Sequence, residues 1–261
     1  MNEKKVALIT GAAGGIGREL CLKFYQLNYL VVGFDKNREK LESVPIDFGF
    51  DCQKFLGLEV DITIPDKINE AIKIVRENLG EIEVVINNAG GPTSNTFKAT
   101  TKEQWENDIN LNLNSAFYML STILPKMVKL NRGVIINIGS VNGLSVYGHP
   151  AYSAAKAGLI HLTKFLAVEY GKYGIRTNVI CPGTVKTEAW KAREDKNPKL
   201  WEELKSLYSI KDLSEPSDIG EIAGFLASPS GRMINGSTII VDGGLTAGIE
   251  SVAEVFTQDK F

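Results

Sequence analysis

Tyr152 and Lys156 are the two side chains in this sequence best placed to move a proton. They begin a segment of helical period, and their spacing of four residues puts both on one helical face. A phenol has an ordinary pKa of about 10 and is a poor base at neutral pH. An ammonium about 5 Å away, at an effective dielectric constant of about 20, favours the phenolate by about 3 kcal/mol, or about two pKa units. We therefore expect Lys156 to lower the pKa of Tyr152 into the range of a general acid/base.

Ser140 and Asn112 could supply polar groups beside this pair. Ser140 follows the apolar run Val134 to Gly139, and open parallel sheets bind ligands at the carboxyl ends of their strands. Asn112 lies inside a long segment of helical period. A solvated helix face would also explain an asparagine there, so its interpretation depends on the other three residues.

A glycine-rich turn follows the first apolar run and leads straight into a helical segment. In such a turn one glycine permits a tight bend, one lets the backbone approach a pyrophosphate, and one lets the helix pack on the strand. Free N–H groups at the start of the helix favour the phosphate charge. The sequence therefore predicts a dinucleotide site here, and its turn residues are Gly11, Gly14, Gly15, Ile16 and Gly17.

Asp35 ends the second apolar run, where a carboxylate can accept hydrogen bonds from an adenosine ribose. A 2′-phosphate beside this carboxylate would meet like-charge repulsion. The residue before Gly15 is Gly14, not a phosphate-binding lysine or arginine. We therefore favour NAD over NADP as the cofactor. Lys36 and Arg38 lie nearby and would oppose this preference if either turned towards a phosphate.

Short apolar runs alternate with longer segments of helical period, which is typical of βαβ units on a parallel sheet. Seven strands are expected at Val6 to Thr10, Tyr29 to Asp35, Phe55 to Asp61, Val84 to Asn87, Val134 to Gly139, Arg176 to Cys181 and Thr238 to Val241. Helices are expected at Ile16 to Gln26, Pro65 to Asn78, Lys102 to Val128, Tyr152 to Tyr173 and Glu215 to Leu226. We predict an α/β chain with one Rossmann domain over residues 1–261, in which helices cover both faces of a seven-stranded parallel sheet.

The composition is that of a globular protein, with 44% apolar and 23% charged residues. The 29 basic and 31 acidic residues are interspersed, so no nucleic-acid partner is expected. The N-terminus is too charged for a signal peptide, and no apolar run approaches the roughly 20 residues that cross a bilayer. We expect a cytoplasmic protein without a membrane partner. The three cysteines are far apart, and neither they nor His149 and His161 suggest a metal site.

Residues 183–214 form a connection far longer than a normal strand-to-helix loop, which suits a substrate lid. The segment contains Trp190 and Trp201. Its charged side chains, which favour a hydroxylated substrate, include Lys186, Glu188, Lys191 and Arg193. The tail, residues 245–261, scatters apolar residues among acids, and it is either frayed or docked on a neighbouring subunit.

Together these motifs resemble those of the classical short-chain dehydrogenases/reductases over essentially the whole chain. The matching segments, in the order and approximate spacing of the family, are TGAAGGIG (10–17), Asp61, NNAG (87–90), INLN (109–112), NIGS (137–140), YSAAK (152–156), CPGTVKT (181–187) and VDGG (241–244). The adjacent Gly14 and Gly15 also satisfy the spacing of the extended, sugar-nucleotide-modifying members. Those enzymes carry an additional C-terminal substrate domain, for which 261 residues leave no room.

The resemblance implies a role for each matching catalytic residue. Tyr152 would be the general acid/base, Lys156 would also hold the nicotinamide ribose, and Ser140 would hydrogen-bond the reacting oxygen. Asn112 would anchor a water of the proton relay, and it is chosen among its neighbouring asparagines because Phe117 follows it by five residues.

The resemblance also extends the cofactor site beyond the glycine turn, Asp35, Tyr152 and Lys156. Asp61 would meet the adenine, Thr187 would approach the nicotinamide carboxamide, and Asn87 would brace the sheet without touching ligand. The further cofactor-binding residues would be Asp61, Ile62, Asn88, Ala89, Gly90, Pro182, Gly183, Val185 and Thr187.

These expectations converge on an NAD-dependent dehydrogenase that oxidises a secondary alcohol, such as a sugar or another polyhydroxy compound, to a ketone or lactone. One alternative is reduction of a 3-oxoacyl thioester with NADPH. Another is a non-catalytic NAD-binding sensor, although such a protein could lose the proton-transfer residues that are all present here. Family members are commonly tetramers, so the resemblance implies a homotetramer joined through Lys102 to Val128 and Tyr152 to Tyr173.

Overall fold

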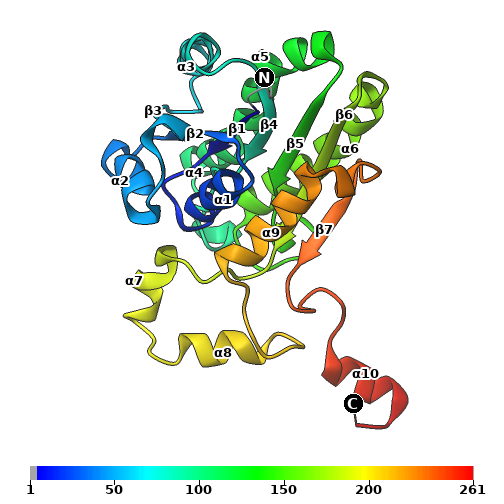
Figure 1. The fold of residues 1–261 in the computed structure, drawn as a ribbon. Helices are drawn as coiled ribbons and strands as arrows, with labels where there is room; N and C mark the ends of the chain where they lie inside the picture. The colour runs from blue at the N-terminus through cyan, green and yellow to red at the C-terminus, as the bar shows by residue number, and fades with distance from the viewer. Residues whose placement is uncertain (1–4, 261) are drawn as a thin grey trace.

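Seven parallel strands form one sheet, as predicted from the sequence, and the structure shows their order to be β3-β2-β1-β4-β5-β6-β7 (Figure 1). The structure is a computed structural model and describes residues 5–260. The strands are β1 (Val6–Thr10), β2 (Leu30–Asp35), β3 (Phe55–Glu59), β4 (Ile82–Asn87), β5 (Gly133–Ile138), β6 (Ile175–Pro182) and β7 (Thr238–Val241). The order of winding reverses between β1 and β4, and ligands bind at such a switch point in open parallel sheets.

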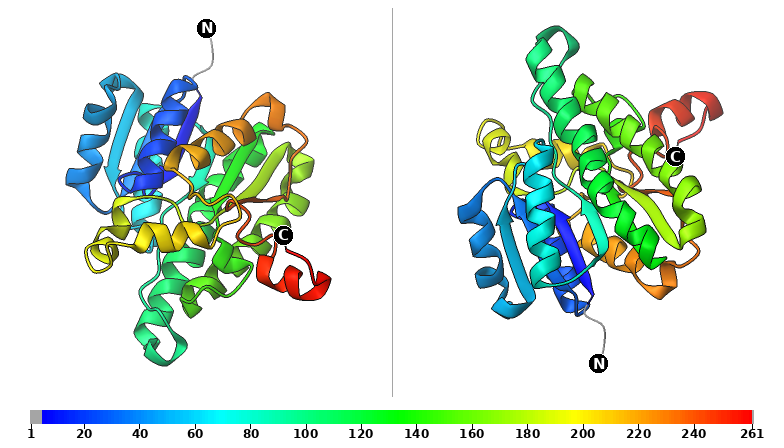
Figure 2. Two further views of the ribbon diagram at one scale, coloured as in Figure 1. Left: turned by 90° about the horizontal axis from the view of Figure 1, so that it is seen from below. Right: turned by 90° about the horizontal axis from the view of Figure 1, so that it is seen from above.

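Helices cover both faces of the sheet because alternate strand residues point to opposite sides (Figure 2). Ala7 and Ile9 pack on one side with α1 and α9, whereas Val6 and Leu8 pack on the other with α3 and α5. The helices of these layers are α1 (Gly15–Gln26), α2 (Arg38–Phe48), α3 (Pro65–Asn78), α4 (Lys102–Ile109), α5 (Ser115–Leu130), α6 (Pro150–Tyr170) and α9 (Pro216–Ala227).

The predicted long helix from Lys102 to Val128 is interrupted. A π-helical turn, Asn110–Asn114, separates α4 from α5, and α5 continues to Leu130. The turn leaves the helix axis continuous but adds a residue to one turn. The predicted segment therefore exists, with a local irregularity at the asparagines.

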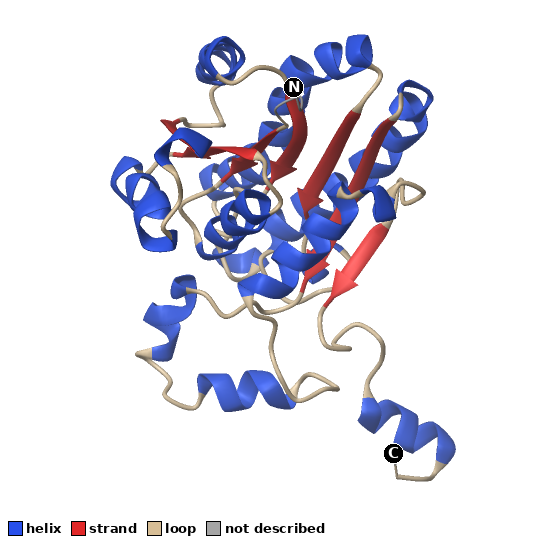
Figure 3. Ribbon diagram, viewed as in Figure 1, coloured by secondary structure: helices blue, strands red, loops and turns tan. Residues whose placement is uncertain are grey.

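Four helices were not predicted from the sequence. Besides α2, they are α7 (Lys191–Glu194) and α8 (Leu200–Ser206) in the lid and α10 (Glu250–Thr257) in the tail. Figure 3 shows α7, α8 and α10 away from the sheet, joined to it by long loops. No residue of these three helices is buried.

Within residues 5–260, no helix has both the length and the apolar character needed to cross a bilayer.

Candidate active site

The glycine turn between β1 and α1 has no room for side chains at either end. Gly11 has a φ of +64°, and a Cβ there would lie 2.8 Å from the Cα of Ala89. A Cβ on Gly17 would collide with the carbonyl oxygen of Gly11. Glycine at both positions lets the start of α1 close onto the end of β1.

Asn88 holds this turn from the neighbouring strand. Its amide Nδ2 donates to the carbonyl oxygens of Thr10 at 2.9 Å and Gly11 at 3.2 Å. The hydroxyl of Thr10 accepts from the backbone N–H groups of Asn88 at 3.0 Å and Ala89 at 3.1 Å. The Asn88 side chain is thus occupied by the turn itself, and it still lines the cavity described below.

Asn87 braces the sheet, as its sequence position indicates. Its Nδ2 donates to Oδ1 of Asn137 at 2.8 Å, and Nδ2 of Asn137 donates to Oγ1 of Thr163 at 2.9 Å. All three side chains are buried, so this chain of hydrogen bonds joins β4, β5 and α6.

The first turn of α1 offers free N–H groups to an anion. Gly14 is the N-cap residue and provides no side-chain hydrogen bond to the helix. A Cβ on Gly15 would lie 2.6 Å from Cγ2 of Thr187, so the start of the lid lies directly against this turn. These donors and the absence of side chains fit the pyrophosphate of a dinucleotide.

The two acidic residues assigned to the adenosine end lie on adjacent strand ends. Asp35 accepts from the backbone N–H of Ala13 at 3.0 Å and of Asn37 at 2.9 Å, which fixes its carboxylate beside the glycine turn. Asp61 accepts from the hydroxyl of Thr63 at 2.6 Å, and this hydrogen bond lowers the pKa of Asp61. The side chain of Ile62 is buried in the core between the sheet and α3 and α5.

Ser140 and Tyr152 meet at the carboxyl end of β5. Ser140 is 8% exposed, and its hydroxyl accepts from the backbone N–H of Asn142 at 3.1 Å. The side chain of Ser140 also contacts the phenol of Tyr152 and opposes the rise of its pKa. The sequence therefore brings these two predicted catalytic residues into direct contact.

Lys156 is buried beneath the phenol. Its Nζ donates to the carbonyl oxygen of Ile138 at 2.7 Å and lies 5.5 Å from the ring centroid of Tyr152. A Cβ on Gly90 would lie 3.2 Å from Nζ, so glycine there gives the ammonium access to the cavity. An ammonium has three donors, and two remain for other oxygens, such as ribose hydroxyls.

The pKa of Tyr152 moves in the direction opposite to the one expected from the sequence. Burial raises the pKa of the phenol, and the contact with Ser140 only opposes this rise. Burial also lowers the pKa of Lys156 to about 8. Desolvation is the largest effect on the pKa of the phenol, and the lowering by Lys156 that the sequence led us to expect is not found. A raised phenol pKa favours the protonated form at neutral pH.

Asn112 lies in the π-helical turn with its amide fully engaged. Oδ1 accepts from the N–H of Gly91 at 2.9 Å, while Nδ2 donates to the carbonyl oxygens of Gly91 at 3.0 Å and Asp108 at 2.9 Å. A Cβ on Gly90 would lie 2.5 Å from Oδ1, so Asn112 and Lys156 flank the same glycine. The asparagine therefore ties the helix to the loop after β4.

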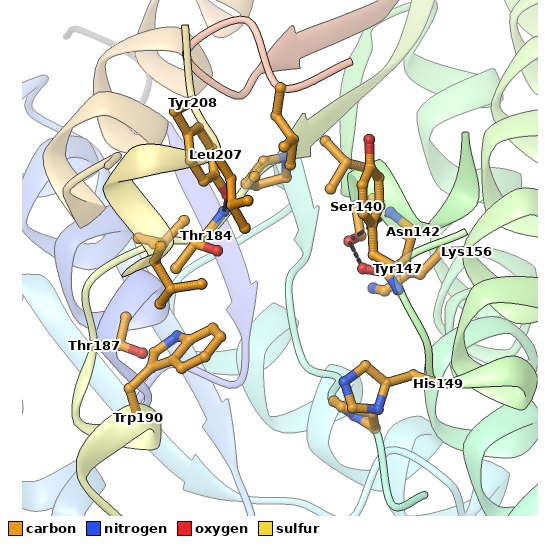
Figure 4. A pocket seen from close by; sticks show the side chains of 18 of the residues that line it. Ser140, Asn142, Tyr147, His149, Lys156, Thr184, Thr187, Trp190, Leu207 and Tyr208 are labelled. Atoms are coloured by element: carbon orange, nitrogen blue, oxygen red, sulfur yellow. Dashed lines mark hydrogen bonds between the residues drawn. The ribbon is translucent and has the colours of Figure 1, made fainter. Parts of the chain in front are cut away.

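A cavity of about 1350 Å³ joins the catalytic residues to the lid and the tail (Figure 4). The predicted residues that line it are Ile16, Asn88, Gly90, Ser140, Tyr152, Lys156, Pro182, Gly183, Val185 and Thr187. The predicted residues outside its lining are Gly11, Gly14, Gly15, Gly17, Asp35, Asp61, Ile62, Ala89 and Asn112.

The lid contributes fewer charges to this cavity than the sequence suggested. Of the four charged lid residues considered, only Arg193 lines it, and its guanidinium stacks on Trp190 at 4.7 Å. Lys186 instead pairs with Glu215 at 2.6 Å, outside the cavity lining. The lid also brings apolar side chains such as Leu207, so the pocket wall is mixed in character.

His149 and Asn142 line the cavity. From the sequence, His149 is either a pocket residue or an incidental loop histidine, and Asn142 is assigned no role. Asn142 Nδ2 donates to the carbonyl oxygen of Gly148 at 3.1 Å, which links the Ser140 turn to the loop before α6. The only sequence signal for His149 was its position three residues before Tyr152. No group of three histidine, cysteine, aspartate or glutamate side chains in the described part of the chain could hold a metal.

The model of the short chain dehydrogenase family matches residues 5–198. The chain belongs to the short-chain dehydrogenase/reductase family. As a member of this family, the chain is an oxidoreductase that uses a nicotinamide dinucleotide to act on CH–OH groups.

Three similar proteins illustrate the range of this family. An uncharacterised oxidoreductase of Schizosaccharomyces pombe is 42% identical to this chain, and the alignment covers 94% of this chain and 92% of the yeast protein. An acetoacetyl-CoA reductase of Acinetobacter is 35% identical over 94% of this chain and 99% of its own. A solved structure of ElxO with NADP bound is 30% identical, with a TM-score of 0.89 over 94% of this chain and all of that one.

Proposed function

We propose that this short-chain dehydrogenase oxidises a secondary alcohol with NAD, in a reversible reaction. The observation that carries the proposal is the contact between Ser140 and Tyr152 above the buried Lys156, at the mouth of the glycine turn. The same arrangement argues against a non-catalytic NAD sensor, because dinucleotide binding alone does not require a buried ammonium beside a phenol.

The proton path follows from these contacts. Ser140 would donate a hydrogen bond to the reacting oxygen, and Tyr152 as phenolate would remove the hydroxyl proton of the alcohol. A nicotinamide held in this site would supply the acceptor for the hydride of the carbon that bears the reacting oxygen. Lys156 carries a positive charge below its pKa of about 8 and would stabilise the phenolate. Asn112 would fix the loop at Gly91 and support a relay water.

NAD is the proposed cofactor because of Asp35. Its carboxylate is fixed beside the glycine turn by Ala13 and Asn37, where a 2′-phosphate would meet its charge. Of the two cations that could oppose this, Arg38 donates to Glu42 at 2.7 Å. ElxO binds NADP, so the preference for NAD proposed here rests on Asp35. Gly11 to Gly17, Asp61, Ile62, Asn88 to Gly90 and residues 182–187 would complete the cofactor site.

A second candidate function is reduction of a 3-oxoacyl thioester with NADPH. The similarity to an acetoacetyl-CoA reductase favours it, as do the apolar lid side chains Leu204 and Leu207 that line the cavity. The raised pKa of Tyr152 suits reduction too, since a protonated phenol is the acid that a carbonyl needs.

We also propose a cytoplasmic homotetramer. The two helices expected at its interface leave large apolar side chains exposed, namely Phe117 on α5 and Phe165 and Val168 on α6. Clustered exposed apolar side chains are typical of interfaces between subunits. Sedimentation at several protein concentrations would test this assembly.

Substrate screening tests the proposed function most directly. Sugars, polyols, hydroxy acids and acyl thioesters would be offered with NAD and with NADP, and the absorbance of the reduced nicotinamide followed. Oxidation of alcohols with NAD is the expected outcome. A marked preference for NADP together with thioester reduction would favour the second candidate.

The variant Tyr152→Phe tests the proton-transfer residue. We expect the variant to keep its affinity for the cofactor and to lose turnover by about a hundredfold or more, which is the usual scale of a lost acid/base catalyst. Turnover is measured at saturating cofactor, and cofactor affinity by fluorescence titration. Near-normal turnover would remove Tyr152 from the mechanism.

A further inference from the structure

The imidazole of His149 is held in one tautomer by a backbone carbonyl. Its Nδ1 lies 2.6 Å from the carbonyl oxygen of Ser94. A carbonyl oxygen only accepts hydrogen bonds, so Nδ1 must carry the hydrogen. In the neutral ring, Nε2 is then an acceptor with a lone pair.

The backbone also fixes the position of this ring. His149 has a φ of 56°, in the left-handed region that few residues other than glycine adopt. Gly148 before it has a φ of +84°, and Pro150 after it begins α6. The N–H of His149 donates to the carbonyl oxygen of Asn95 at 3.0 Å. A left-handed residue of this kind persists where its surroundings over-determine it, and such positions often occur at functional sites.

The ring lies in the wall of the catalytic cavity, next to the proton-transfer residue. The imidazole and the phenol of Tyr152 are packed edge to face, with centroids 6.4 Å apart. Figure 4 shows His149 and Trp190 on opposite sides of the cavity. Across the described residues, no protein group hydrogen-bonds to Nε2 of His149, so this acceptor is available to a substrate.

The neighbouring polar side chain cannot take the same part. Asn142 donates through Nδ2 to the carbonyl oxygen of Gly148 at 3.1 Å and to Oγ of Ser153 at 3.3 Å. Its Oδ1 faces the hydroxyl of Ser140 at 3.4 Å. Of Asn142 and His149, only His149 therefore keeps an acceptor, Nε2, that no described residue engages.

We propose that Nε2 of His149 accepts a hydrogen bond from a hydroxyl on the carbon next to the reacting carbon, and so selects vicinal diols over simple secondary alcohols. The proposal rests on the proposed oxidoreductase function and names its substrate class. While Tyr152 and Ser140 bind the reacting oxygen, a hydroxyl one carbon away can reach the adjacent imidazole. A substrate with an ether or carbonyl at that carbon has no hydrogen to donate. A site built to bond a hydroxyl discriminates against the analogue that lacks it.

Nitrogen NMR tests the tautomer without any turnover. The chain has two histidines, so histidine labelled with the NMR-active nitrogen isotope gives two sets of signals. The exposed His161 is assigned by the variant His161→Gln. At a pH where the ring is neutral, we expect Nδ1 of His149 to be protonated and Nε2 to resonate as an unprotonated ring nitrogen. A hydrogen on Nε2 would overturn the proposal.

Kinetics test the selectivity with cyclohexanol and its vicinal trans-diol. The variant His149→Asn tolerates the left-handed backbone and can still donate to Ser94, but it lacks an acceptor at the Nε2 position. We expect the ratio of kcat/KM for the diol to that for cyclohexanol to fall about tenfold, mainly through KM, as for one lost hydrogen bond. His149→Gln, whose longer amide reaches that position, should recover most of the ratio. His161→Gln is the control and should keep the wild-type ratio.

The outcomes separate this inference from the proposed function. The role of His149 would be wrong if His149→Asn lost kcat/KM equally for both alcohols. It would also be wrong if the wild type preferred cyclohexanol to the diol. Either result would leave the proposed oxidoreductase function intact. If the wild type oxidised neither alcohol and reduced neither corresponding ketone with either nicotinamide, the proposed substrate class would fail. In that case the substrate screen would show whether any other alcohol or carbonyl compound is turned over.

Discussion

The glycine turn and the lid lie against each other beside one cavity, yet they are built in different ways. In the turn, Gly11 and Gly17 leave no space for a Cβ. Four hydrogen bonds also join Thr10 and Gly11 to Asn88 and Ala89. In the lid, α7 and α8 bury no residue and project from the body of the molecule. Cofactor binding thus depends on backbone geometry, whereas substrate binding depends on exchangeable side chains. This difference explains how similar chains of one family can act on different substrates.

The largest effect is expected from a single methyl group in the turn. Gly17→Ala places a Cβ against the Gly11 carbonyl oxygen and should destabilise the fold by about 3 kcal/mol or more, because backbone atoms cannot move aside. Chemical denaturation measures the loss. Gly14→Ala is the matched control, because its Cβ would lie 3.4 Å from the nearest atom, and it should cost less than about 1 kcal/mol. Equal stability of the two variants would contradict the account of a turn without free space.

The next largest effect concerns the positive charge of Lys156 beside the phenol of Tyr152. Lys156→Met removes the cation near Tyr152, so the pKa of the phenol should rise further and the phenolate should form only at higher pH. We expect the rate of alcohol oxidation at neutral pH to fall about ten- to a hundredfold. The increase of kcat with pH should occur at more alkaline pH than in the wild type. The pH profile of kcat at saturating cofactor measures this displacement. An unchanged profile would mean that the charge of Lys156 does not act on the phenol.

The charge of Asp35, beside the glycine turn, is expected to set the preference between NAD and NADP. Asp35→Asn removes the negative charge and keeps an acceptor for one of the two N–H groups, because Ala13 and Asn37 donate to different oxygens of the carboxylate. The ratio of kcat/KM with NADP to that with NAD should rise about tenfold, which corresponds to about 1.4 kcal/mol. Glu59→Gln, which removes the same charge from the end of the adjacent strand, is the control. A similar rise of this ratio in both variants would mean that the preference for NAD comes from the general electrostatic field of the protein and not from Asp35.

The smallest effect on stability is expected in the lid. Trp190→Ala should change the unfolding free energy by less than about 1 kcal/mol, because α7 and its flanking turn bury nothing, but it should raise KM for the substrate about fivefold. Trp201 stacks near Trp190 with centroids 6.1 Å apart but does not line the cavity. Trp201→Ala should therefore change KM less. A large loss of stability in Trp190→Ala would show that the lid is part of the core.

The sheet could be predicted because each strand is a continuous apolar run, and β1 to β7 lie within a few residues of their expected bounds. The helix α2 was missed although Asn37 caps its start, Leu41 and Val44 face the core, and Gly49 ends it in a left-handed conformation. Pro45 inside the helix concealed this pattern, since proline normally ends a helix. The error shows that capping residues can outweigh one internal proline.

The grouping of three proposed catalytic residues could be predicted from the sequence, whereas their environment could not. Motif spacing placed Ser140, Tyr152 and Lys156 together correctly, whereas the pKa of Tyr152 depends on burial by elements that the spacing does not describe. The tautomer of His149 is likewise set by Ser94, which lies 55 positions away in the chain. Desolvation and long-range hydrogen bonds are properties of the folded chain, so local patterns do not reveal them.

The π-helical turn at Asn110–Asn114 couples the site to the core. Each residue of an α-helix advances it by about 100°, so deleting one residue here would restore regular winding and rotate everything beyond it by that angle. Met119, Ile123 and Met127, all buried on α5, would then swing out of the sheet-facing stripe. The extra residue that positions Asn112 therefore also sets the helical phase of α5, and neither can be altered alone.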